Sequence, residues 1–152
     1  MVPVTVRRLL TGHSVCVRYW LREPTSDEWV VQNIMSINQG ALGVVPWGDP
    51  TLSKPASEFA LSLHNITLYL FNPALVRAAY VVGGVSVATR EGGAQTLVLA
   101  TITNYVNQTV SWKALGLDGA GVTTVFASGV AATVEGGFTL GPVGSGAFVA
   151  TA

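Results

Sequence analysis

The sequence predicts a parallel α/β segment over residues 1–72, followed by an antiparallel β domain over residues 73–152. Two predicted helices, residues 26–38 and 54–70, flank a short apolar run at residues 41–45. A helix, a buried strand and a second helix in this order are typical of a parallel α/β layer. After Asn72 the apolar residues instead alternate with polar ones, and glycine-rich turns recur at short intervals. This second pattern is typical of an antiparallel β-sandwich.

The composition is that of a folded protein with an apolar core. Of the 152 residues, 49% are hydrophobic and 11% are charged, against roughly 25% charged in an average globular protein. The formal net charge is +0, which removes the electrostatic argument for binding nucleic acid or an anionic membrane surface. No apolar run reaches the ~20 residues of a membrane span. We therefore expect neither a nucleic acid nor a membrane as a partner.

The predicted helices carry local signals at both ends. Thr25 or Ser26 suits the N-cap of the first helix, and acidic residues follow in its first turn. Gly40 is placed to end that helix as a C′ glycine. The second helix presents an apolar face at helical spacing, and Asn72 before a proline ends it.

The β domain is expected to consist of short strands separated by turns. The predicted strands are residues 76–82, 85–89, 96–103, 109–112, 123–127, 131–134, 138–140 and 147–150. The intervening segments, such as residues 83–84, 128–129 and 144–146, are rich in glycine and are therefore expected to form turns.

Trp47 directly follows the apolar run at residues 41–45. The carboxyl end of a parallel strand is where α/β folds bind their ligands. A tryptophan there offers a large rigid surface on which the apolar face of a sugar can stack. A core tryptophan that closes the end of the sheet fits the position equally well.

Two carboxylates lie near predicted strand ends. Glu23 follows a predicted strand at residues 14–21, and Asp49 lies in the loop after Trp47. Glycoside hydrolysis requires a pair of carboxylates, and these two are the pair that the sequence offers. The alternatives are an exposed glutamate beside Arg22 and a turn-forming aspartate before Pro50.

No motif for a metal or a cofactor is present. The two histidines, His13 and His64, have no partners at ligand spacing, and neither a phosphate-binding loop nor a GxSxG motif occurs. The single cysteine, Cys16, lies in an apolar stretch and is expected to be a small buried hydrophobe. We therefore expect no cofactor.

Two glycosylation sequons begin at Asn65 and Asn107. They fit a secreted parent protein. The first residues of the chain do not themselves form a signal peptide, because their arginines follow the apolar residues and no long apolar core comes after them.

Three segments, QNIMSIN (residues 32–38), GALGVVPW (40–47) and DPT (49–51), resemble the carboxyl-terminal part of fungal secreted glycoside hydrolases with a (β/α)8 barrel. In that family the last barrel strand ends in a tryptophan, and the final helix leads into a small β-sandwich. Four segments of the β region are similar to these all-β tails: residues 95–101, 115–117, 125–129 and 144–148.

The resemblance implies an α/β remnant of a (β/α)8 barrel over residues 1–72, followed by an all-β antiparallel sandwich over residues 73–152. It implies that Trp47 lines the sugar subsite, with Asp49 beside it. Glu23 matches the family's nucleophile only if residues 14–21 are the seventh barrel strand, and the strand that carries the acid is missing. We therefore expect an incomplete glycosidase that binds carbohydrate and is inactive by itself.

Two other interpretations remain open from the sequence. The chain could be a non-enzymatic β-sandwich module, carbohydrate-binding or structural, with helices packed against it. It could also be a phage or virion structural protein, since such proteins share its richness in Gly, Ala, Thr and Val. A buried Trp47 would favour the first of these, and a regular oligomer would favour the second.

Overall fold

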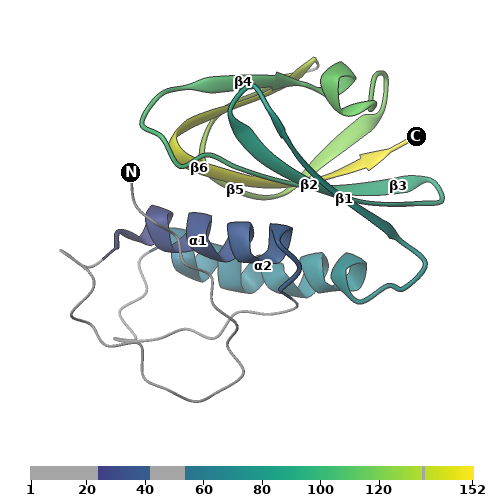
Figure 1. Ribbon diagram of the computed structural model, residues 1–152, viewed down its shortest axis with the longest axis horizontal. Helices are drawn as coiled ribbons and strands as arrows, with labels where there is room; N and C mark the ends of the chain where they lie inside the picture. Colours follow the sequence, from purple (N-terminus) through teal and green to yellow (C-terminus); the bar gives the residue numbers. More distant parts are fainter. Residues whose placement is uncertain (1–23, 42–53, 135) are drawn as a thin grey trace.

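A computed structural model of the protein describes residues 24–41, 54–134 and 136–152. Within these ranges two α-helices lie side by side as one layer, and a curled antiparallel sheet lies above them (Figure 1). The helices are α1 (Ser26–Asn38) and α2 (Lys54–Leu70). Both run from left to right in Figure 1, so that their carboxyl ends lie toward the same side of the molecule.

The bounds of both helices agree with those predicted from the sequence. Thr25 is the N-cap of α1, and it forms a capping box with Glu28. The Glu28 N–H donates to Thr25 Oγ1 at 3.3 Å, and the Thr25 N–H donates to Glu28 Oε2 at 2.8 Å. Gly40 follows the end of α1 with a φ of 106°, which confirms its predicted role as the residue that ends the helix.

The strands form one sheet in which every pairing between described residues is antiparallel. Along the sheet the order is β1-β2-β3-β6-β4, and β5 pairs with β6 on the other side. The strands are β1 (Val76–Val82), β2 (Val85–Gly92), β3 (Gln95–Thr101), β4 (Gln108–Ser111), β5 (Gly121–Val134) and β6 (Gly137–Thr151). A short 3-10 helix, η2 (Trp112–Leu115), follows β4.

The curl of the sheet is produced by the long β5–β6 hairpin. The first part of β6 pairs with β4, and its last part pairs with β3. The register of β5 against β6 shifts at three points, as β-bulges do where a strand bends. At this bend a Cβ on Gly144 would lie 2.8 Å from Gly129 O, so the two strands approach too closely for a side chain.

The two faces of the sheet bury separate sets of side chains. On the concave face, Phe138, Phe148 and Trp112 form a cluster of aromatic rings whose centroids are 4.8–5.3 Å apart. On the other face, Leu97 and Leu99 of β3 pack against α1 and α2. The helices contribute the following buried residues to this second cluster: Val30, Ile34, Ile37, Phe59, Ile66 and Leu70.

The predicted fold class is wrong. The described residues contain no (β/α)8 remnant, because their strands pair only antiparallel and both helices cover one face of that antiparallel sheet. The expected two-sheet sandwich is replaced by one curled sheet. The error arose because the glycine-rich segments at residues 128–129 and 144–146 were interpreted as turns, whereas they are bends inside β5 and β6.

Two parts of the sequence interpretation stay predictions. The apolar run at residues 41–45 lies outside the described residues except for Ala41. The division of the chain into residues 1–72 and 73–152 is also untested.

The close approach of β4 and β6 makes Gly137 sensitive to substitution. A Cβ at Gly137 would lie 2.2 Å from Val110 O and 2.8 Å from Ser111 Cα, which are both backbone atoms. We expect Gly137→Ala to lower the free energy of unfolding by about 1–3 kcal/mol, since overpacking forces the backbone to shift. Urea denaturation followed by circular dichroism measures this change.

Gly136→Ala is the matched control, because a Cβ at Gly136 has no atom within 4 Å. The control should unfold at the same urea concentration as the parent chain. Equal stability of the Gly137→Ala protein would contradict the close approach of β4 and β6.

Candidate functional site

Helix α2 has an apolar face on each side. Phe59, Ile66 and Leu70 are buried against the sheet. On the opposite side Leu61 is 80% exposed and Leu68 is 63% exposed. These two leucines are seven residues apart and therefore lie two turns apart on the same side of the helix.

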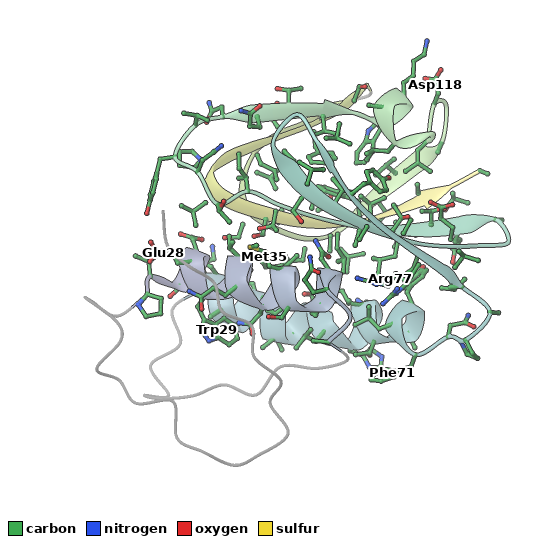
Figure 2. The ribbon with its side chains drawn as sticks, in the orientation of Figure 1. Glu28, Trp29, Met35, Phe71, Arg77 and Asp118 are labelled. Carbon is green, nitrogen blue, oxygen red and sulfur yellow. The ribbon has the colours of Figure 1, made fainter. Side chains whose placement is uncertain are left out.

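Three further residues complete this outward surface. His64 and Asn65 are exposed and lie between the two leucines. Phe71, which directly follows α2, is 59% exposed and points away from the sheet (Figure 2). We call Leu61, His64, Asn65, Leu68 and Phe71 the α2 outer face.

The α2 outer face has the chemistry of a docking surface. Burial of one leucine side chain is worth about 1.5–3 kcal/mol, so a partner that covered both leucines would gain a substantial free energy. A single exposed leucine is ordinary in a soluble protein. Leu61, Leu68 and Phe71 are three exposed apolar side chains on one side of the helix, and apolar side chains gathered in this way mark interaction sites.

Side-chain hydrogen bonds hold the helical layer in place beneath the sheet. Ser128 Oγ of β5 donates to Asp27 Oδ1 in the first turn of α1. Tyr105 Oη donates to Glu28 Oε1 at 3.0 Å, and Tyr69 Oη of α2 donates to Gln95 Oε1 of β3 at 3.1 Å. The bond of Tyr69 helps to fix which side of α2 faces outward.

The predicted catalytic and sugar-binding residues cannot be placed. Glu23, Trp47 and Asp49 all lie outside the described residues. Their roles therefore stay predictions, and so does the proposed pairing of Glu23 with Asp49.

The two predicted glycosylation sites lie in contrasting surroundings. Asn107 is exposed in the loop before β4. Asn65 is exposed in the middle of α2, where the hydroxyl of Thr67 in its sequon donates to His64 O at 2.9 Å. A glycan on Asn107 would extend into solvent, whereas a glycan on Asn65 would stand between Leu61 and Leu68.

A shallow groove lies beside the β2–β3 turn. It has a volume of about 320 Å³ and is formed by the β2–β3 turn, the loop after η2 and the end of the chain. Apart from Asp118, its lining consists of small residues and one leucine. It therefore offers neither an aromatic platform for a sugar nor a pair of carboxylates.

Within the described residues, no cluster of three or more His, Cys, Asp or Glu side chains has the arrangement of a metal site. Neither described helix has the length and apolar character that crossing a bilayer requires.

Comparisons with known proteins leave the family of this chain open. No family model matches the sequence, and no curated protein or solved structure shows significant similarity to it.

The exposed leucines were missed by the sequence interpretation, although a signal for them was present. The sequence interpretation assigned one apolar face to this helix and did not identify Leu61 and Leu68, which are exposed. A second pair of apolar residues opposite the core face of a helix indicates that this side can be covered by a partner. The spacing of Leu61 and Leu68 contained this signal.

The different surroundings of the two sequons lead to a prediction. We expect a glycan on Asn107 to leave the fold unaffected, because the side chain lies in an exposed loop. Expression in a secretory eukaryotic host should therefore give a folded protein whose mass falls by one glycan in Asn107→Gln. Mass spectrometry of the parent chain, Asn107→Gln and the control Asn65→Gln measures this. An unmodified Asn107 in secreted protein would contradict the prediction.

Proposed function

We propose that this chain is a non-catalytic accessory module of a glycoside hydrolase, and that it does not hydrolyse O-glycosidic bonds by itself. In this proposal the α2 outer face packs against the remainder of the enzyme. The observation that carries the proposal is the exposure of Leu61 and Leu68 on the side of α2 opposite the sheet. The class of enzyme rests on the sequence resemblance of residues 32–51 alone, because the barrel that this resemblance implied is not found among the described residues.

The carboxylates of the described residues support a non-catalytic role, because most of them hold the structure together. Asp27 accepts a hydrogen bond from Ser128, and Glu28 completes the capping box of α1. Glu91 accepts a hydrogen bond from Thr89 at 2.8 Å, and Glu58 lies 3.6 Å from Lys54 Nζ on the surface of α2. Glycosidase chemistry needs two carboxylates that face a common substrate, and these four serve separate local contacts.

A second candidate function, carbohydrate binding without catalysis, is favoured by Tyr105. Its side chain is 68% exposed and its hydroxyl is held by Glu28. A rigid exposed aromatic ring suits stacking on a sugar. Binding of an oligosaccharide that is lost in Tyr105→Ala would favour this function over the first.

The proposed lack of activity can be tested directly. We expect the purified chain to release no product from a panel of aryl glycosides above the rate of the uncatalysed reaction. The measurement is the release of the aryl alcohol over time, with a known glycosidase as the positive control. Turnover that Glu23→Gln abolishes would overturn the claim of inactivity.

The role of the α2 outer face can be tested with a double variant, Leu61→Gln with Leu68→Gln. Glutamine has a helix propensity similar to that of leucine, so α2 should remain intact. We expect the variant to bind at least twofold less of an apolar fluorescent dye than the parent chain, with an unchanged unfolding temperature.

Val76→Thr with Val81→Thr is the matched control for that experiment. These two valines of β1 are 70% and 71% exposed, but they lie in a strand and not on α2. Threonine has a similar preference for strands. Equal dye binding by the leucine double variant and the parent chain would contradict the assignment of the docking surface to α2.

A further inference from the structure

Two arginines lie opposite each other on the face of the sheet that carries the helices. Arg77 of β1 and Arg90 of β2 are cross-strand partners, so their side chains leave the sheet on the same side. Figure 2 shows Arg77 below the sheet, near the end of the helical layer. Its guanidinium donates to the carbonyl oxygen of Asn38, the last residue of α1.

The charge of this arginine pair is not balanced by the described residues. The ion pair found among them joins Lys54 and Glu58 on α2, and neither arginine has a carboxylate partner in that part of the chain. Burial lowers the pKa of Arg90, and the positive charge of Arg77 lowers this pKa further. The repulsion between directly opposed like charges therefore remains in the folded protein.

The carbonyl groups at the end of α1 offset only part of this charge. The carboxyl end of a helix carries roughly half a negative charge, whereas the two guanidinium groups carry two full positive charges. A guanidinium group has five N–H donors, and the bond to Asn38 uses one from Arg77. Both arginines therefore keep N–H donors that have no acceptor among the described residues.

Asn38 adds a third group with unused hydrogen-bonding capacity. Its side chain is 1% exposed, and neither Nδ2 nor Oδ1 has a partner among the described residues. The backbone carbonyl of Asn38 accepts the hydrogen bond from Arg77, so Asn38 joins the end of α1 to the arginine pair. A buried amide without partners costs free energy.

We propose that Arg77 and Arg90 form a binding site for a small oxyanion beside the end of α1. A planar guanidinium group matches the two oxygens of a phosphate, sulfate or carboxylate group, and two such groups can hold one anion between them. Binding neutralises the repulsion between the arginines. This proposal does not depend on the glycosidase proposal, since it concerns a different face of the molecule from the α2 outer face.

Arg90→Gln is the decisive variant. It removes one of two repelling charges and leaves the contact between Arg77 and Asn38 in place, so the protein should fold at least as well as the parent chain. We expect inorganic phosphate to raise the unfolding temperature of the parent chain in a saturable manner, relative to chloride at equal ionic strength. In Arg90→Gln the affinity for phosphate should fall at least fivefold.

Lys113→Gln is the charge-matched control, because Lys113 lies in η2, which packs against the concave face of the sheet away from the helices. Isothermal titration calorimetry should give the same phosphate affinity for this control as for the parent chain. Titrations with sulfate and acetate distinguish tetrahedral from carboxylate anions, and saturable binding of either that Arg90→Gln weakens supports the site. Equal stabilisation by chloride, or full phosphate binding by Arg90→Gln, would overturn it.

Discussion

Burial of β3 on both faces is the constraint on which the rest of the structure depends. Leu97 and Leu99 pack against the helices, while Val98 and Ala100 belong to the cluster on the concave face. A strand in this position needs cover on both sides, because its side chains alternate between the two faces. The helical layer supplies one cover, and the curl of the sheet supplies the other.

The curl follows from β6, which pairs with β4 at its start and with β3 at its end. The bend between these two parts brings Phe138 and Phe148 onto the same aromatic cluster, with ring centroids 4.8 Å apart. Small residues are needed where β5 and β6 approach each other, and Gly129 and Gly144 meet this need. β6 therefore contributes to both clusters. Phe138 and Phe148 lie in the cluster on the concave face, and Ala147 lies against the helices.

The α2 outer face and the arginine pair both result from the position of the helical layer. Once Phe59 and Ile66 are turned toward the sheet, helical geometry places Leu61 and Leu68 on the outside. The carboxyl end of α1 likewise meets the β1–β2 hairpin, so that Asn38 contacts Arg77. The two surfaces lie on different sides of this layer and can therefore serve different partners.

The sequence by itself determined the bounds of both helices, a cap at Thr25 or Ser26, the end of α1 at Gly40 and the strand at residues 76–82. These features depend on neighbours a few residues away, and their signals are therefore local. The single curled sheet and the bends inside β5 and β6 were decided only by the tertiary structure. Each of these depends on which strands become neighbours, and a glycine that bends a strand looks the same in the sequence as a glycine that ends one.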